Sequence, residues 1–188
     1  MFSLLETFYP VSDSLKQALI KSSEEVSLPK DTILFKIGDV ASSAFFIAKG
    51  MARTFYYKGE KEITSNLCPE NRIFISASSY YTGQPSYETG ELIEDSELII
   101  LPHENIEKLC LEFMELNYVI RKLVEIFYVV LDQRTYFLHM KNVKERYDFL
   151  MQNNPDFFLR APLGQIASFL GMTSETLSRL RAQNLVKS

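Results

Sequence analysis

The chain has 188 residues, 46% of them apolar, which is enough to bury the core of one large or two small domains. Two cysteines exclude a disulfide framework, and there is no membrane-spanning apolar run and no leader of the signal-peptide type, so a cytoplasmic protein is expected. The net charge is −4, but residues 141–188 hold seven basic and four acidic side chains, and residues 1–140 therefore carry −7. This asymmetry favours an anion-binding C-terminal part.

Residues 1 to about 25 are expected to be helical, because apolar side chains recur there at helical spacing. The inward-facing side chains would be Leu4, Leu5, Phe8, Leu15, Ala18 and Leu19. From Val26 to Leu101, short β-rich runs are separated by turn residues, and no helical crossover lies between them. The predicted strands are Thr32–Phe35, Phe45–Ala48, Ala52–Tyr57, Ile63–Leu67 and Leu98–Leu101. An antiparallel barrel or sandwich follows from this spacing.

After Pro102 the sequence becomes helical for a long stretch. Its apolar positions step by four and three, which is typical of a coiled-coil seam: Leu116, Ile120, Leu123, Phe127, Val130, Arg134 and Phe137. Such a seam can pack against the β-rich part or against a second copy of the chain. Further apolar residues beside it widen the surface and favour a homodimer, with Leu116, Ile120, Leu123, Phe127, Val130 and Phe137 at its interface.

Two more helical regions follow. Residues 141–153 are predicted to form an amphipathic helix that Pro155 terminates, with Val143, Tyr147, Leu150 and Met151 facing inward. Residues 162–182 are predicted to form two short helices joined by a tight turn at Gly171, with Thr173 capping the second. Their inward side chains would be Leu163, Ile166, Ala167, Leu170, Leu177 and Leu180.

The outer face of the last helix carries polar side chains. A glutamate accepts a hydrogen bond from cytosine and an arginine donates two to guanine, so Glu175 and Arg179, four residues apart, can read adjacent base pairs. The predicted base contacts are Ser174, Glu175, Ser178 and Arg179, and the predicted phosphate contacts are Lys141, Lys144, Thr173 and Arg181. A packing hairpin with a solvated outer face is the alternative that this pattern leaves open.

The segment I-A-S-F-L-G-M-T-S-E-T-L-S-R-L-R, residues 166–181, resembles the recognition signature of the CRP/FNR transcription regulators, in which a Glu-x-x-Ser-Arg run reads DNA. The run F-K-I-G-D-V-A-S-S-A-F-F-I-A-K-G-M-A-R, residues 35–53, resembles the opening of a cyclic-nucleotide-binding β-roll. The resemblance implies a homodimer joined by its long helix, with recognition helices in DNA half-sites about one turn apart. It leaves RNA polymerase open as a further partner.

The resemblance breaks in the stretch that holds the cyclic nucleotide. The family uses a Gly-Glu pair for the ribose and an Arg-Ser or Arg-Thr pair for the phosphate, whereas Ser76-Ala77 and Pro85-Ser86 stand at those places here. A buried phosphate without a cation is costly, so binding of cAMP is not expected. The polar and aromatic residues at this place form a possible pocket for an uncharged ligand, a closed vestige of the nucleotide site, or an exposed loop. They are Ser76, Ser78, Ser79, Tyr80, Tyr81, Gln84, Ser86 and Tyr87.

Other cofactors are also not expected. An iron–sulfur cluster needs more cysteines than Cys68 and Cys110, and His103 and His139 are interpreted as surface or hinge residues rather than haem ligands. No metal-ligand cluster or catalytic motif is present, so the chain is not expected to be an enzyme. Residues 183–188 are too few for the β-hairpin wing that family members often add.

The sequence thus predicts an α+β protein in three parts. Residues 1–112 would form an antiparallel β-roll of jelly-roll (double-stranded β-helix) type, residues 113–140 a long dimerisation helix, and residues 141–188 a helix-turn-helix domain. The expected function is transcription regulation by a homodimer that binds a palindromic DNA site and does not respond to cAMP. Two alternatives remain: a sensor switched by an unknown small ligand in the β-roll, and a protein-interaction module that does not bind DNA.

Overall fold

The structure, a computed structural model, describes residues 1–185. The last three residues of the expected C-terminal domain, 186–188, lie outside the described residues. Contacts divide the chain into two compact units, which we call the first unit (Met1–Thr54 and Leu67–Phe127) and the second unit (Phe55–Asn66 and Tyr128–Ser188). The division therefore falls inside the long helix and inside one β-hairpin.

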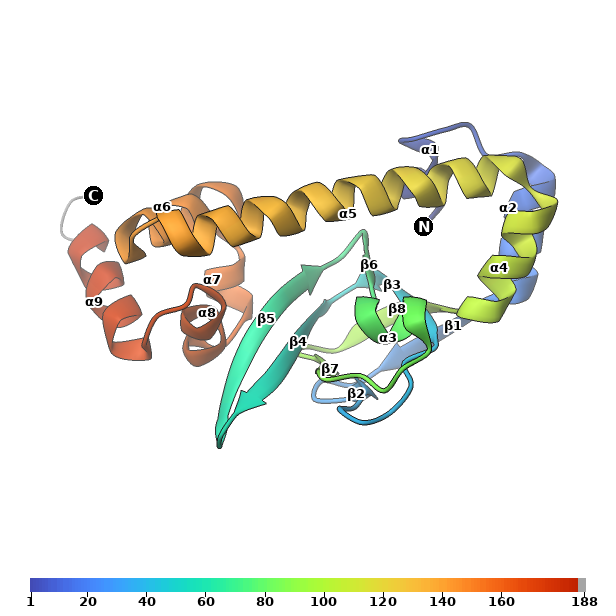
Figure 1. Cartoon of the computed structure of the whole chain (residues 1–188). Helices are drawn as coiled ribbons and strands as arrows, with labels where there is room; N and C mark the ends of the chain where they lie inside the picture. The colour runs from blue at the N-terminus through green and yellow to red at the C-terminus, as the bar shows by residue number, and fades with distance from the viewer. Residues whose placement is uncertain (186–188) are drawn as a thin grey trace. The chain divides into compact units, whose positions relative to one another are not determined.

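Two four-stranded sheets carry the strands of the described chain (Figure 1). In chain order the strands are β1 (Glu24–Leu28), β2 (Ile33–Phe35), β3 (Ser43–Lys49), β4 (Met51–Lys58), β5 (Lys61–Pro69), β6 (Arg72–Phe74), β7 (Thr89–Leu92) and β8 (Ser96–Pro102). One sheet has the order β1-β8-β3-β6 and the other β2-β7-β4-β5. The pairs β1–β8, β3–β8, β3–β6 and β2–β7 are antiparallel, as the sequence predicted.

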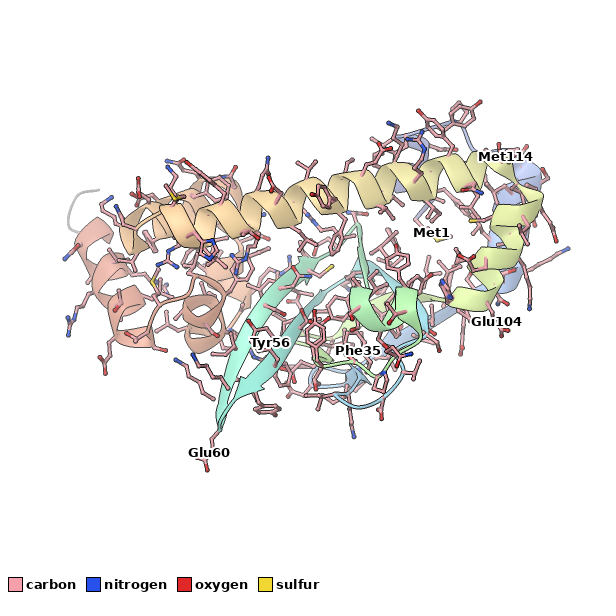
Figure 2. The ribbon with its side chains drawn as sticks, viewed as in Figure 1. Met1, Phe35, Tyr56, Glu60, Glu104 and Met114 are labelled. Atoms are coloured by element: carbon pink, nitrogen blue, oxygen red, sulfur yellow. The ribbon has the colours of Figure 1, made fainter. Side chains whose placement is uncertain are left out.

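The first unit has a core cluster to which strands of both sheets contribute. Its members are Phe35, Ala41, Phe45, Ile47, Ala52, Cys68, Phe74, Leu92 and Leu98. The rings of Phe35, labelled in Figure 2, and Phe74 stack with their centroids 5.5 Å apart. A Cβ on Gly90 of β7 would lie 2.4 Å from the Phe35 ring, so glycine is needed where this strand passes the aromatic pair.

Helices α1 (Phe2–Glu6), α2 (Asp13–Ser22) and α4 (His103–Glu112) and the start of α5 (Met114–Met140) share a second core cluster in the first unit. Its buried members are Leu5, Val11, Leu15, Leu19, Ala44, Tyr80, Leu101, Ile106, Leu109, Leu116 and Val119. The region of residues 1 to about 25 is helical as expected up to Ser22, but it forms two helices, because α1 ends at Glu6, Pro10 follows, and Ser12 caps a new helix by accepting from the Leu15 amide at 3.2 Å.

The second unit consists of the outer part of the β4–β5 hairpin, the rest of α5 and four helices of the described chain: α6 (Val143–Asn153), α7 (Phe157–Arg160), α8 (Leu163–Phe169) and α9 (Ser174–Leu185). A capping box starts α6, in which Asn142 accepts from the Glu145 amide at 3.0 Å and Glu145 accepts from the Asn142 amide at 2.8 Å. Tyr147 and Leu150 are buried as expected, whereas Val143 and Met151 are 37% and 38% exposed, which corrects their inward assignment.

Candidate nucleic-acid interface

The turn between α8 and α9 has the geometry of a Schellman motif. Gly171 has φ +67°, its amide donates to the Ser168 carbonyl at 2.9 Å, and the Met172 amide donates to the Ala167 carbonyl at 2.9 Å. The left-handed conformation explains why glycine follows Leu170 in the sequence. The predicted helix-turn-helix arrangement is therefore present in the second unit.

Two arginines bind the carbonyl end of α8. Arg146 of α6 donates to the Leu170 carbonyl at 2.8 Å, and Arg134 of α5 donates to the Phe169 carbonyl and lies 3.9 Å over the Phe169 ring. Burial and the charge of Arg146 lower the pKa of Arg134 to about 10. Because these guanidinium groups satisfy carbonyls that no helical amide can reach, they hold the turn against α5 and α6.

Thr173 caps α9 as predicted. Its Oγ1 accepts from the Thr176 amide at 3.2 Å and lies 3.0 Å from the Thr176 hydroxyl. Leu177 is fully buried and Leu180 is partly buried, so the inward face of α9 is also as predicted. The orientation of α9 about its own axis follows from this anchoring.

The predicted base-reading side chains lie together on the opposite, exposed face of α9. The exposed residues there are Ser174, Glu175, Ser178, Arg179 and Arg181. Within residues 1–185, neither Glu175 nor Arg179 forms an ion pair or a side-chain hydrogen bond, although they are one helical turn apart. Both charged groups are therefore available to an external hydrogen-bonding partner.

The predicted phosphate contacts are less uniform. Lys141 lies 3.7 Å from Glu145 and Lys144 forms an ion pair with Asp148, so both lysines are already paired along α6. Both pairs are on the surface, where an ion pair contributes only about 0–1 kcal/mol and exchanges easily. Arg181 has no ion pair among the described residues, and the Thr173 hydroxyl is occupied by the cap.

The eight residues of the possible effector pocket differ in burial. Ser76, Ser79, Tyr80 and Ser86 are buried, whereas the other four are exposed: Ser78, Tyr81, Gln84 and Tyr87. Burial raises the pKa of the Tyr80 phenol. Neither of the two cavities described here, one beside α9 and one between the N-terminal helices and the start of α5, is lined by any of these residues.

The two ends of the nucleotide-binding stretch are joined to each other. The hydroxyls of Ser76 and Ser86, which stand where the family carries its Gly-Glu and Arg-Ser pairs, lie 2.9 Å apart with exposures of 0% and 2%. Ser79, in the short helix α3 (Ala77–Thr82), donates to the Gln84 carbonyl at 2.6 Å and accepts from the Ala41 amide at 2.8 Å. The buried hydroxyls of Ser76, Ser79 and Ser86 therefore have hydrogen-bond partners within the chain.

The sequence did not reveal one buried cation, Arg53. Arg53 of β4 donates through Nε to Glu91 of β7 at 2.5 Å, and the two side chains are 6% and 15% exposed. The only sequence signal was an arginine in the first half of a strand, among residues that are buried, and this does not reveal its partner. Because the guanidinium is paired, it does not supply the free cation that a buried phosphate requires.

The predicted interface residues of α5 divide into two groups. Leu116 is 1% exposed inside the first unit, and Ile120 and Leu123 pack against the same cluster, so the assignment of Leu116 to a dimer interface is corrected to the core of the chain itself. Phe127 and Val130 are 41% and 48% exposed. Further exposed apolar side chains follow along the helix: Val124, Ile126, Tyr128, Val129, Leu131, Tyr136 and Met140.

Phe137 also packs within the chain. Its ring lies 5.2 Å from that of Phe149 in α6, so it joins α5 to the helix-turn-helix in the second unit. Arg134, which continued the predicted seam, binds α8 instead. The exposed apolar surface of α5 is thus centred on Phe127 and Val130.

The remaining candidates for cofactor binding have other surroundings. His103 lies 3.6 Å from Glu107 and packs on the Tyr80 ring, and His139 is exposed. No group of three or more His, Cys, Asp and Glu side chains able to hold a metal ion occurs in the part of the chain that the structure describes. Among the helices of residues 1–185, none has the length and apolar character needed to cross a membrane.

Residues 25–113 match the family model of the cyclic nucleotide-binding domain. Two curated relatives are an anaerobic regulatory protein of Pasteurella multocida, 27% identical over 167 residues, and one of Haemophilus influenzae, 26% identical over 167 residues. Each match covers 81% of this chain, but only 60% and 63% of the respective relative. The chain therefore spans somewhat less than two thirds of the length of these proteins.

Solved structures share the fold. FixK2 of Bradyrhizobium japonicum superposes with a TM-score of 0.73 at 20% identity, covering 88% of this chain and 85% of that one. A CooA mutant of Carboxydothermus hydrogenoformans gives 0.71 at 21% identity, covering 96% and 83%. The domain match and these structures show the fold of a cyclic nucleotide-binding domain, and the regulatory relatives and the signature in α9 make the chain similar to the CRP/FNR transcription regulators.

Proposed function

We propose that this protein regulates transcription by binding a two-fold symmetric DNA site as a homodimer, without cAMP. The observation that carries the proposal is the exposed set Glu175, Ser178 and Arg179, which has no ion pair within residues 1–185 and lies on a helix whose other face is anchored by Leu177. A helix presented in this way by a helix-turn-helix fits the major groove of B-DNA. The role is binding, not catalysis.

The proposed dimer rests on α5. Phe127 and Val130 lie among further exposed apolar side chains of the same helix, and a monomeric protein rarely leaves a contiguous apolar surface of this kind uncovered. A second copy of the same helix, related by a two-fold axis, would cover both surfaces. Two recognition helices would then face two half-sites, so the preferred DNA should be palindromic.

We expect no response to cAMP because hydrogen bonds within the chain close the nucleotide-binding stretch. A cyclic nucleotide would have to break the contact between Ser76 and Ser86 and bury its phosphate without a free cation. The second candidate function is a sensor for an uncharged effector that opens this stretch. Such a molecule could first meet the side chains of Tyr81 and Tyr87, which are 53% and 59% exposed.

Selection from a randomised duplex pool at low salt, followed by sequencing of the bound fraction, tests the proposal. The expected result is a palindrome whose half-sites are about one DNA turn apart, recovered without added ligand. The selected duplex should then bind the protein with a stoichiometry of one duplex per two chains in sedimentation equilibrium.

Two results would contradict parts of the proposal. A palindrome recovered only after a small molecule is added would favour the effector-switched sensor. Unselective binding, or no binding at low salt, would leave the protein-interaction module as the better description. A matched control is the double variant Glu175→Ala and Arg179→Ala, which should retain the fold because both side chains are exposed, and should yield no consensus.

A further inference from the structure

The outer part of the β4–β5 hairpin belongs to the second unit with the helix-turn-helix. Residues 55–66 form it, and the chain reverses between Lys58 and Lys61 with Gly59 at φ +64°. Figure 2 shows Glu60 at the tip of this hairpin, pointing away from the strands. We call residues 58–62 the hairpin tip.

Hydrogen bonds tie the hairpin to α8. The Thr64 amide donates to Ser168 Oγ at 2.9 Å, and Ser168 Oγ lies 3.4 Å from the Glu62 carbonyl as a donor. Thr64 is 2% exposed, so the hairpin side of this contact is buried. The backbone of the hairpin is therefore held at a defined place beside the first helix of the helix-turn-helix.

A cavity of about 440 Å³ separates the hairpin tip from the start of α9. Lys61 and Glu62 line one side, and the other lining residues belong to α8, the turn and α9: Gly164, Ser168, Met172, Thr173, Ser174 and Glu175. Lys61 thus shares one concave surface with Ser174 and Glu175, two of the side chains assigned to base contacts.

The lysines of the hairpin tip have no ion-pair partner in the described part of the chain. Lys58 and Lys61 are exposed and form no ion pair within residues 1–185, unlike Lys141, which precedes α6, and Lys144 in α6. An exposed lysine on a long flexible stem beside a base-reading helix is the usual kind of phosphate contact, because it neutralises the backbone without requiring a fixed geometry.

We propose that Lys61 contacts a DNA phosphate flanking the bases that α9 reads. The β4–β5 hairpin would then be part of the DNA-binding surface, although it emerges from the β-roll. The inference rests on the proposed function and adds a second, sequence-independent contact to it. A displacement of this hairpin would change DNA affinity without any change in the orientation of α9.

Lys61→Gln removes the charge and keeps most of the side chain. Its affinity for the selected palindrome and for a scrambled duplex should fall by the same factor, so the ratio between the two should equal that of the parent. The slope of log affinity against log salt concentration should decrease by about 0.9 for each lost phosphate contact, or about 2 for a dimer. Fluorescence anisotropy at a series of salt concentrations measures both quantities.

Two further variants extend the test: one is expected to raise DNA affinity, and the other is a control. Glu60→Gln removes an exposed acidic group from the same hairpin tip and should raise affinity for both duplexes, because a like charge near the phosphates is lost. Lys49→Gln is the matched control, since Lys49 is an exposed lysine of the first unit that lies 3.6 Å from Glu97. It should leave the salt slope unchanged.

The outcomes separate the two proposals. If the parent binds DNA and Lys61→Gln retains the parental salt slope, the role of Lys61 is overturned and the proposed function stands. If Lys61→Gln changes the preference between duplexes, the contact is to a base and the phosphate assignment is overturned. If the parent binds no DNA at low salt, the proposed function fails and this inference fails with it.

Discussion

Arg179 and Glu175 form no ion pair with each other in the described residues, unlike several oppositely charged pairs at the same spacing on other helices. The acidic and basic side chains of α4, α5 and α6 pair at one-turn spacing, for example Arg121 with Glu125 and Lys144 with Asp148. Glu175 and Arg179 have the same spacing but form no ion pair in the described part of the chain. An unpaired guanidinium loses less on binding a base than a paired one, since no ion pair must first be broken.

Arg179→Ala should weaken binding to the selected palindrome by about 1–3 kcal/mol for each half-site contact, since a bidentate contact to guanine is lost. Preference at one G·C pair per half-site should also be relaxed. Quantitative anisotropy with duplexes substituted at each position measures both effects. A variant that chose sites as the parent does would show that Arg179 does not read a base.

Cys68 supplies a test of the core. Burial raises the pKa of its thiol to about 12 from an ordinary value of 9.0. Between these values the unfolded chain loses the proton and the folded chain keeps it, so the free energy of unfolding should fall as the pH rises above about 9, by up to about 1.4 kcal/mol per pH unit.

Urea unfolding at pH 8, 9, 10 and 11 measures this dependence for the parent and for Cys68→Ala. The variant loses a constant amount of stability from the smaller side chain, but its curve against pH should be flatter than that of the parent. Parallel curves would mean that the Cys68 thiol ionises equally in both states. Cys110, which is only partly buried, remains in both proteins and cancels in the comparison.

At the scale of elements, α5 has three differently packed parts: its first turns, its middle and its last turns. Its first turns complete the helical core cluster of the first unit through Leu116 and Val119, and its last turns hold α6 and α8 of the second unit through Phe137 and Arg134. The exposed apolar residues Phe127 and Val130 lie between these packed ends. The middle of the helix is therefore the part available to a second chain.

Phe127→Asp and Val130→Asp should each raise the dissociation constant of the homodimer by about 100-fold or more, because a charge would be buried at the centre of the interface. Both side chains are exposed in a single chain, so thermal unfolding of the monomer should change little. Sedimentation equilibrium gives the constant. Leu111→Asp, at an 87% exposed position of α4, is the matched control and should leave it unchanged.

At the scale of the whole molecule, the stretch that corresponds to the family's ligand-binding site has buried polar groups that bond to one another. Ser76 bonds to Ser86, Ser79 bonds to Gln84 and Ala41, and Arg53 is paired with Glu91. Hydrogen-bonding groups that are already paired gain little from a ligand that must displace their partners. The β-roll is therefore expected to act as a scaffold for α5 and the hairpin.

Addition of 1 mM cAMP should leave the melting temperature unchanged to within about 1 °C. A ligand present at 100 times its dissociation constant would add about 2.7 kcal/mol to the free energy of unfolding, which a thermal shift detects easily. A rise in the melting temperature with cAMP would contradict the view that the nucleotide-binding stretch is closed. A rise with another small molecule would support the effector-switched alternative and identify a ligand for it.

Local signals in the sequence were sufficient for much of this molecule. Gly171 and Thr173 located the turn and cap of the helix-turn-helix, because a left-handed residue and a capping hydroxyl act within one helical turn. Strands β2, β3, β4, β5 and β8 were also predictable from their β-rich runs between turns. Strands β1, β6 and β7 were not, since their polarity is set by neighbouring strands that are distant in sequence.

Only the tertiary structure decided which surfaces remain free. The heptad spacing of α5 marked an apolar seam, but burial of Leu116 in the helical core and of Phe137 against Phe149 divided that seam between the chain itself and a possible partner. The contacts of Ser76 with Ser86 and of Thr64 with Ser168 join residues 10 and 104 positions apart. Composition and periodicity report what one segment can bury, whereas the partner that buries it depends on how the whole chain packs.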